Sequence, residues 1–286
     1  MEVISIYNQK GGVAKTTMTW LIGEGLTYCD KGADGVFNKV LLIDFDAQCN
    51  LTETFLNDKK SKEMRNECNI LNVLKGASIT ENALETGYRN LFILPGSEEL
   101  DDMDAATVSD LSKPLSAALQ EFMKTNMVDY VIIDNNPTKN YATNATMLVS
   151  NLIIIPYVPD LYTYNRLRKT VSRMKEDYPE TKYKIVTSKY KKGSTTWAYQ
   201  EAAKAVFADD IAETIIPDSS DIANILQDKK SPYTIKASGK ISDAYFNLIA
   251  ELFGFDSEKS VINMISQKRE RKAEFARKNL LKMKGA

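Results

Sequence analysis

Hydrophobic residues along this chain gather in short apolar runs, which alternate with longer segments where they recur at helical spacing. The apolar runs predict buried strands at residues 2–7, 40–43, 91–96, 128–134, 151–159, 182–188 and 211–216. The periodic segments predict helices at residues 17–28, 69–75, 78–86, 105–125, 161–178, 195–207 and 238–253, and the charge-dense residues 57–68 predict an exposed loop. Strands that alternate with helices predict an α/β fold with a doubly wound, mostly parallel sheet flanked by helices.

Length and composition favour one large domain and exclude several kinds of active site. A chain of 286 residues with 43% hydrophobic content can bury a sizeable core. Histidine is absent, which excludes Ser/His/Asp and Cys/His nucleophiles and histidine-ligated metals. Cys29, Cys49 and Cys68 form no C-x-x-C pair, so we expect reduced thiols in a cytosolic protein. We expect neither a signal peptide nor a membrane span, because no apolar run approaches the roughly 20 residues that cross a bilayer.

Charge is distributed unevenly along the chain. The net charge is −1, but residues 267–286 hold eight basic residues against Glu270 and Glu274 and carry +6, which leaves −7 for the remainder. An acidic body with a basic tail predicts a polyanionic partner for the tail. A solvated helix that packs back on its own body is the alternative. The basic residues of the tail are Lys268, Arg269, Arg271, Lys272, Arg277, Lys278, Lys282 and Lys284.

A glycine turn lies between the first predicted strand and the first predicted helix, in the stretch Asn8-Gln9-Lys10-Gly11-Gly12-Val13-Ala14-Lys15-Thr16-Thr17. The backbone N–H groups of such a turn and the helix dipole can hold a phosphate chain. Ala14-Lys15-Thr16 matches the G-K-[ST] end of the motif G-x-x-x-x-G-K-[ST], with Ala14 in place of the usual second glycine. Lys15 falls where an ammonium reaches the outer phosphates, and Thr16 where a hydroxyl ligates Mg²⁺. Lys10 is a second lysine, which could also be merely a solvated loop residue.

Aspartates follow two of the predicted strands. Asp44 and Asp46 come directly after the strand at 40–43, and Asp134 ends the strand at 128–134 in the Walker B pattern. Ligands bind at the carboxyl ends of the strands in open α/β sheets, so we expect these side chains to meet there. Asp134 would bind Mg²⁺ through water. Capping of the next helix is the alternative role for Asp44 or Asp46.

The string K-G-G-x-x-K-T-T resembles the deviant Walker A loop of the ParA/MinD superfamily, whose signature lysine, here Lys10, contacts nucleotide bound by the partner subunit. The strings D-x-D-x-Q-x-N from Asp44 and ILNVLKGASITENAL…NLFILPGS, together with the strand that ends at Asp134, are similar to ParA segments in the same order. The resemblance to ParA-type partition ATPases covers residues 1–254. We therefore predict a P-loop ATPase domain at 1–254 and a basic, helical C-terminal extension at 255–286.

Several positions depart from the pattern of this family. Ala47 and Cys49 stand where proline and glycine are usual, and Asn135-Asn136-Pro137 stands where relatives usually continue with two prolines. The second departure affects the segment that is expected to sense the terminal phosphate. Where many relatives carry arginines after a late proline, this chain has Asp218 and Asp221. Any DNA-binding surface that depends on arginines there must be built differently.

The resemblance implies an ATP and Mg²⁺ site, whose residues follow from matching positions. Asp46 would orient or deprotonate the attacking water, because the matching family position has that role. We assign catalysis to Lys10, Lys15 and Asp46, and Mg²⁺ binding to Thr16, Asp44 and Asp134. We assign nucleotide binding to Lys10, Gly11, Gly12, Val13, Ala14, Lys15, Thr16 and Thr17, with Thr187, Ser188, Pro217 and Asp218 at the adenine.

The resemblance also implies a cytoplasmic, nucleoid-associated ATPase of the plasmid type, without an N-terminal DNA-binding domain. It would form an ATP-sandwich homodimer and bind double-stranded DNA without sequence preference, through the tail and lysines near Lys189, Lys191 and Lys192. A ParB-like centromere-binding protein would stimulate a slow hydrolysis and so release the DNA.

Two other functions stay open from the sequence. A MinD-like positioning ATPase would use the tail to bind a membrane, but the apolar stripe of the tail is thin and interrupted by Arg269 and Lys272, which favours DNA over membrane. Its members are Ile265, Ala276, Leu280 and Met283. A binding-only protein would use ATP as a dimerisation switch without useful turnover. The departures at Ala47, Cys49 and Asn135-Asn136 motivate that reading, and Asp46 argues against it.

Overall fold

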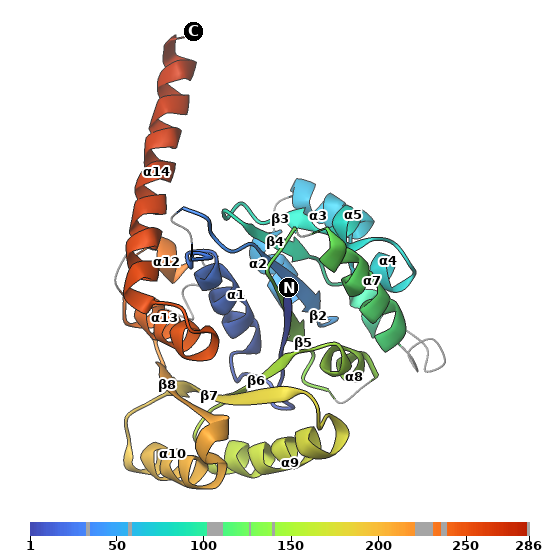
Figure 1. Cartoon of the computed structure of the whole chain (residues 1–286), viewed down its shortest axis with the longest axis vertical. Coiled ribbons are helices and arrows are strands. Elements are labelled where there is room, and N and C mark those ends of the chain that lie inside the picture. Colours follow the sequence, from blue (N-terminus) through green and yellow to red (C-terminus); the bar gives the residue numbers. More distant parts are fainter. Residues whose placement is uncertain are drawn as a thin grey trace.

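The computed structural model describes residues 1–286 apart from 33–34, 57–58, 102–110, 126, 139–140, 221–230, 236–238 and 285–286 (Figure 1). Within 59–62, 141, 234–235 and 272–284 it describes the backbone but not the side chains. Asp221, the start of the helix predicted at 105–125 and the side chains of the basic tail from Lys272 onward therefore lie outside the described residues.

The strands form one sheet with its phosphate-loop strand near the middle. In the described part of the chain the sheet has eight strands in the order β3-β4-β2-β5-β1-β6-β7-β8. Every neighbouring pair is parallel except β3 and β4. The predicted doubly wound, mostly parallel α/β sheet is confirmed. The strands are β1 (Glu2–Ile6), β2 (Val40–Phe45), β3 (Leu84–Glu85), β4 (Leu91–Leu94), β5 (Tyr130–Asn135), β6 (Leu152–Tyr157), β7 (Lys182–Tyr190) and β8 (Ile211–Pro217).

Successive residues of the central strands face opposite layers of helices. Ile4 and Ile6 of β1 belong to the core on one face, whereas Val3 belongs to the core on the other. Both faces are covered, which is why these strands read as unbroken apolar runs. The first face carries α1 (Lys15–Leu26), α12 (Pro232–Ile235), α13 (Lys240–Phe253) and α14 (Ser257–Lys284), with α2 (Asn50–Phe55) beside α1. The second carries α4 (Ile70–Leu74), α5 (Ile79–Asn82), α7 (Ser112–Lys124), α8 (Tyr141–Leu148), α9 (Leu161–Asp177) and α10 (Ser194–Phe207).

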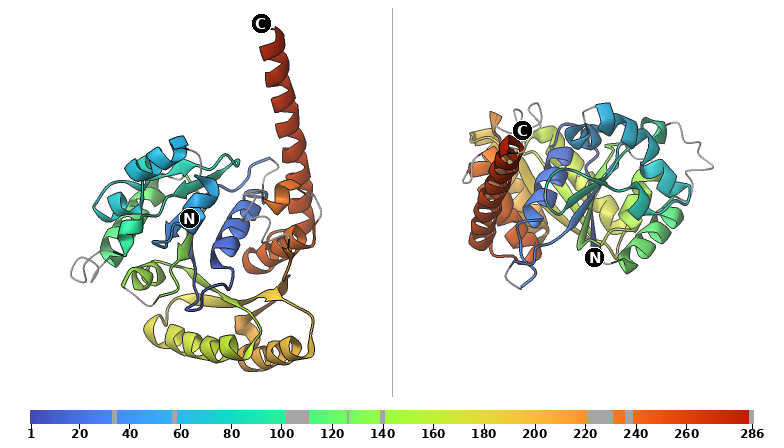
Figure 2. Two further views of the ribbon diagram at one scale, coloured as in Figure 1. Left: turned by 180° about the vertical axis from the view of Figure 1, so that it is seen from behind. Right: turned by 90° about the horizontal axis from the view of Figure 1, so that it is seen from above.

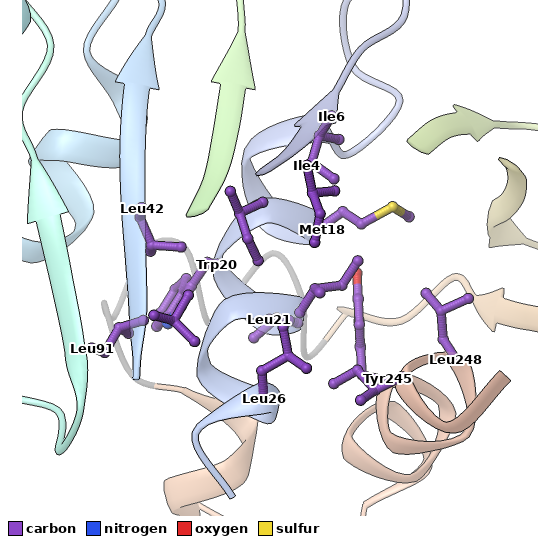
Figure 3. Close-up of a cluster of buried hydrophobic side chains, with 14 of the residues drawn as sticks. Ile4, Ile6, Met18, Trp20, Leu21, Leu26, Leu42, Leu91, Tyr245 and Leu248 are labelled. Atoms are coloured by element: carbon purple, nitrogen blue, oxygen red, sulfur yellow. The ribbon is translucent and has the colours of Figure 1, made fainter. Parts of the chain in front are cut away.

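Helix α1 lies in the interior of the first layer. Every residue of this helix except Thr16 is buried. Figure 3 shows Met18, Trp20 and Leu21 within the cluster that fills the space between the sheet and α13. The Trp20 ring meets the Phe55 ring edge-on, with ring centroids 5.4 Å apart. Burial of such large side chains contributes roughly 1.5–3 kcal/mol each, so α1 is held firmly against the sheet.

Two glycines allow this close packing of α1. A Cβ atom on Gly23 would lie 2.5 Å from Cδ2 of Leu42 in the sheet. A Cβ atom on Gly25 would lie 2.4 Å from Cδ1 of Ile249 and 2.6 Å from the hydroxyl oxygen of Tyr233. Both distances are well inside van der Waals contact. The helix is therefore in contact with the sheet through one glycine and with the outer elements through the other.

Two local predictions are wrong. The segment predicted as an exposed loop forms α3 (Lys59–Glu67), because its lysine, glutamate, methionine and arginine residues are good helix formers, and a helix with one apolar residue shows no apolar stripe. The helix predicted at 78–86 ends after α5, and the chain continues as β3. The hydroxyl of Ser78 caps α5 by accepting from the Glu81 N–H, and Ala83 is already extended. Leu84 then reaches the sheet edge beside Ile93.

The C-terminal helix α14 begins on the body of the protein and extends beyond it (Figures 1 and 2). Met264 of its early turns is buried in the core under α13, and Ser260 and Gln267 are buried beside it. The same views show the last turns of the helix projecting past the other elements. Among the helices that the structure describes, none is both long enough and apolar enough to cross a bilayer.

Candidate functional site

A pocket opens at the carboxyl ends of β1, β2 and β5, where the sequence analysis places its chemistry. Its volume is about 670 Å³. The loop that joins β1 to α1 forms one wall, and the segments after β2 and β5 form others. The described lining residues are Gly11, Gly12, Ala14, Lys15, Thr16, Thr17, Asp46, Gln48, Asn50, Glu53, Thr54, Asp101, Asn136, Pro137, Thr138 and Lys189.

The glycine turn leaves room for a ligand. A Cβ atom built on Gly11 or Gly12 would have no neighbour within 4 Å, and Gly12 has a left-handed backbone with φ of 75°. Ala14 caps α1 with φ of 70° and ψ of 31°, a conformation that costs an L-residue roughly 1–2 kcal/mol. The side chain of Asn8 supports the turn by donating to the Pro156 carbonyl and accepting from the Lys10 N–H. The open turn at the start of α1 has the shape of an anion cradle.

Lys15 brings its ammonium group into this pocket from a buried position. The residue is 8% exposed, and Nζ lies 3.5 Å from the carbonyl oxygen of Lys10. Burial lowers the pKa of Lys15, while the negative charges of Asp134 and Asp46 act in the opposite direction. An ammonium that has lost part of its hydration interacts strongly with any phosphate that enters the pocket.

Asp134 supplies a buried acceptor at the end of β5. Burial, and after it the negative charge of Asp44, raises the pKa of Asp134 to about 8, while the Thr16 hydroxyl and Lys15 lower it. Its Oδ2 atom has no hydrogen-bond partner among the described residues. An oxygen of Asp134 without a partner, in a group that the charges of Asp44, Asp46 and Lys15 all influence, fits a bound cation, which would favour the ionised form of Asp134. Within the described residues, no three His, Cys, Asp or Glu side chains form a metal site by themselves, so water and phosphate oxygens would complete the ligands.

Asp44, predicted as a metal ligand, is engaged with the protein in this structure. Its Oδ2 accepts from the backbone N–H and the hydroxyl of Thr52 at 2.8 and 2.7 Å, and its Oδ1 accepts from the Asp46 N–H at 3.2 Å. Burial raises its pKa to about 6 against these hydrogen bonds. Asp44 is fully buried and is outside the described lining of the pocket. The geometry makes it an anchor for α2 and for the turn that carries Asp46.

Asp46 lines the pocket where an attacking water could be oriented. It is 8% exposed, and its Oδ1 accepts from the Gln48 N–H at 3.0 Å. The turn then passes through Cys49, which has φ of 52° at the start of α2, where relatives usually have glycine. Burial raises the pKa of the Cys49 thiol to about 12, so this cysteine is a packing residue.

Lys10 points away from the pocket that its own loop forms. Its Nζ donates to the Thr163 hydroxyl at 2.7 Å and to Oδ2 of Asp160 at 3.1 Å, at the first turn of α9. Asp160 also caps α9 by accepting from the Thr163 N–H at 2.7 Å. Partial burial opposes ionisation of Asp160, but the hydrogen bonds from Thr163 and Lys10 outweigh it and lower the pKa. The second lysine of the loop is therefore held at the surface.

The four residues predicted at the adenine lie outside the described lining of the pocket, and one of them, Ser188, contacts the loop. Ser188 donates from its hydroxyl to the Val13 carbonyl at 3.1 Å, and the Thr187 hydroxyl donates to Gln200. Asp218 pairs with Lys191 at 3.0 Å. Pro217 ends β8 beside Tyr190 of β7. Their role at a base stays a prediction.

Nine of the described lining residues were not assigned to the site from the sequence, and Lys189 and Asn136 are two of them. Lys189, predicted near DNA, donates from Nζ to the Gly12 carbonyl at 2.8 Å and has a left-handed backbone with φ of 49°. Its position directly after a predicted strand end was the available signal. Asn136 also lines the pocket, and the sequence marks it only as a departure from the family pattern after the strand that ends at Asp134.

Comparisons with known proteins agree with this geometry. A family model described as an AAA domain matches residues 1–186. The chain is 25% identical over 287 residues to the chromosome partitioning protein ParA of Caulobacter vibrioides, covering 96% of this chain and 98% of that one. It is 29% identical over 224 residues to the sporulation initiation inhibitor protein Soj of Bacillus subtilis, covering 76% and 84%. A putative plasmid partition protein of Borrelia burgdorferi B31, solved with bound AMPPNP, has the same fold, with a TM-score of 0.70, 20% identity and coverage of 93% and 99%.

Proposed function

The chain belongs to the ParA-type partition ATPases, and from this premise we propose that it is an ATP-operated switch for DNA segregation. It binds ATP with Mg²⁺, forms a homodimer around the nucleotide and then binds double-stranded DNA without sequence preference. A ParB-like centromere-binding protein stimulates hydrolysis, which returns the chain to its monomeric, DNA-free form. The setting for these steps is the cytoplasm, on the nucleoid.

The observation that carries this proposal is the placement of the two loop lysines. Lys15 is buried inside the pocket, whereas Lys10 lies outside it on the first turn of α9. The burial of Lys15 in the pocket supports a role for this lysine at the nucleotide of its own subunit. Lys10 lies at the surface, outside the described lining of that pocket, which supports a role for it at the nucleotide of a second subunit. This arrangement supports a dimer in which each subunit completes the site of its partner.

The chemistry proposed for the pocket is mainly positioning and neutralisation of charge. Lys15 and the backbone of the glycine turn would hold the phosphates. Thr16 and Oδ2 of Asp134, which has no hydrogen-bond partner among the described residues, would hold the cation. Mg²⁺, when bound, supplies positive charge at the phosphate oxygens. Asp46 orients the attacking water and accepts its proton, since the sequence contains no histidine for that role.

The proposed DNA surface is formed by local basic clusters. The tail carries +6 against −7 for the rest of the chain, and Lys191 and Lys192 are exposed in the turn after β7. Asp218 offsets part of the charge of Lys191. Lys189 is withdrawn from this surface, because its ammonium contacts the phosphate loop. If a dimer neutralises about six phosphates, its affinity for DNA falls roughly a thousandfold between ~50 and ~200 mM salt.

A dimerisation experiment tests the central step. Sedimentation of the unaltered protein with a non-hydrolysable ATP analogue should show a dimer, and Lys10→Ala should retain nucleotide binding but lose hydrolysis and weaken the dimer. The matched control is Lys31→Ala, which removes a surface lysine paired with Asp129 at the amino-terminal end of β5, away from the pocket. A monomer under these conditions for the unaltered protein would refute the sandwich model.

DNA binding and turnover are tested separately. Deletion of residues 267–286 should weaken DNA binding and leave basal phosphate release nearly unchanged. Equal DNA affinity of the shortened dimer would remove the tail from the proposal, and tight binding to anionic vesicles would favour the membrane alternative. Phosphate release that stays negligible with DNA and a centromere-binding protein present would favour the binding-only alternative.

A further inference from the structure

Asn136 holds its side-chain amide in a defined orientation at the wall of the nucleotide pocket. The Oδ1 atom lies 2.8 Å from both the backbone nitrogen and the hydroxyl of Thr138. A backbone N–H can only donate, so the atom that faces it must be the amide oxygen. The amide nitrogen, with its two N–H groups, is therefore at the other end of the side chain. Among the described residues no acceptor bonds to it.

The segment that carries Asn136 is anchored on both sides. The preceding residue, Asn135, is buried and donates from Nδ2 to the Ile6 carbonyl at the end of β1. Its Oδ1 accepts from the hydroxyl of Thr146 in α8. Pro137, which follows, has a fixed φ. Asn136 thus lies between a residue tied to two elements of the fold and a rigid proline, and it starts directly from the strand that ends in Asp134 and Asn135.

The chemical match is between this amide and an anion. Asn136 is half-buried and lines the same pocket as Lys15, Thr16 and Asp46. Its N–H groups are donors, and phosphate oxygens accept hydrogen bonds. Where relatives usually have a proline, no side-chain donor is available. This chain therefore adds a neutral donor to a wall that the usual pattern leaves without one.

We propose that Nδ2 of Asn136 donates a hydrogen bond to the terminal phosphate of bound ATP, so that this side chain distinguishes triphosphate from diphosphate. The inference rests on the proposed function, since it deepens the nucleotide specificity of that site. Thr138 is a positioning residue in this scheme. Its backbone N–H and its hydroxyl both donate to the amide oxygen of Asn136, which leaves the amide nitrogen pointing away from Thr138.

The test compares the affinities of a non-hydrolysable ATP analogue and of ADP by calorimetry. Asn136→Ala removes the donor, and we expect about a ten- to hundredfold loss of affinity for the analogue with ADP affinity kept within about threefold. Asn136→Asp keeps the acceptor for Thr138 but removes the N–H groups, and it should lose at least as much preference for the analogue. Thr138→Val should produce a smaller loss in the same direction.

The matched control is Asn151→Asp, which makes the same change in an asparagine whose Oδ1 accepts from the Val3 N–H at the other end of the sheet. It should leave the ratio of the two affinities unchanged. Equal losses for both nucleotides in Asn136→Ala, or a loss in Asn136→Asp alone, would overturn the inference. If the unaltered protein binds neither nucleotide, the proposed function fails instead, so the two failures are distinguishable.

Discussion

The contact of Lys10 with Asp160 predicts that the protein restrains its own dimerisation. Asp160→Asn should strengthen the ATP-dependent dimer, because it removes the charge that holds Lys10 on α9. Asparagine is as good a helix cap as aspartate, so the Thr163 N–H keeps its acceptor and α9 keeps its start. The change therefore acts on the ion pair rather than on the helix.

The size of the effect follows from the geometry of the pair. At 3.1 Å, two unit charges attract by about 1 kcal/mol in bulk water and about 5 kcal/mol at an effective dielectric constant of 20. Both side chains are more than one third exposed, at 36% and 37%, and pairs of this kind are measured at roughly 0.2–1 kcal/mol. We take the ion pair of Lys10 with Asp160 to contribute about 0.5–1 kcal/mol per subunit once screening by solvent is included. A dimer releases two lysines, so its dissociation constant should fall roughly five- to thirtyfold.

The assay is sedimentation over a range of protein concentrations with a non-hydrolysable ATP analogue. At high salt the difference between Asp160→Asn and the unaltered protein should shrink, because salt screens exposed charges. The control is Asp177→Asn, which breaks the ion pair of Arg173 with Asp177 at the other end of the same helix. It should leave the dimer unaffected. A weaker dimer for Asp160→Asn would refute the reasoning and would place Asp160 in the subunit contact itself.

Three further predictions follow from other parts of the site and its supporting helix. Asp46→Ala should bind ATP and dimerise but lose about a hundredfold or more of stimulated phosphate release, and undiminished turnover would exclude Asp46 as the group that orients water. Glu24 is fully buried on α1, and burial raises its pKa to about 7 against hydrogen bonds that include those from Trp20 and Tyr28. Because the native state holds this proton longer than the unfolded chain, Glu24 should lower stability as pH rises from about 4.5 to about 7, by an amount on the order of 3 kcal/mol. Urea unfolding at pH 5 and pH 8 should show a smaller loss for Glu24→Gln, and an unchanged loss would contradict the assignment. Ala14→Gly should raise stability by about 0.5–1 kcal/mol in urea, since glycine relieves the left-handed backbone, and a decrease would show that Ala14 is not strained.

The sheet and the phosphate loop could be predicted because each leaves a local signal. Strands covered on both faces are apolar over four or more successive residues, and the loop has a fixed spacing between Gly11 and Lys15. The signal fails where a helix has only one apolar residue, as in α3, and where an edge strand is as short as β3. Both lack the periodicity on which such predictions depend.

Contacts between distant parts of the chain could not be predicted from the sequence. Lys10 and Asp160 are separated by 150 residues, and no spacing rule connects them. Asp44 and Thr52 are only eight residues apart, but the strand-end position of Asp44 did not indicate this contact, and its role as a metal ligand stays a prediction. The orientation of Asn136 depends on a turn two residues long, which the residue types permit but do not specify. In each case the side-chain type indicated the chemistry, and only the fold decided its partner.

The close packing of α1 limits the conformational change that nucleotide binding could cause in this protein. Helix α1 packs against the sheet at Gly23 and against the outer elements at Gly25, and neither position has room for a methyl group, so we expect this helix to stay in place when the bound nucleotide changes. The phosphate chain would therefore occupy one fixed position whether ATP or ADP is bound. We therefore expect the conformational response to loss of the terminal phosphate in the segments around the pocket. These are the turn after β2, the segment after β5 and Lys10.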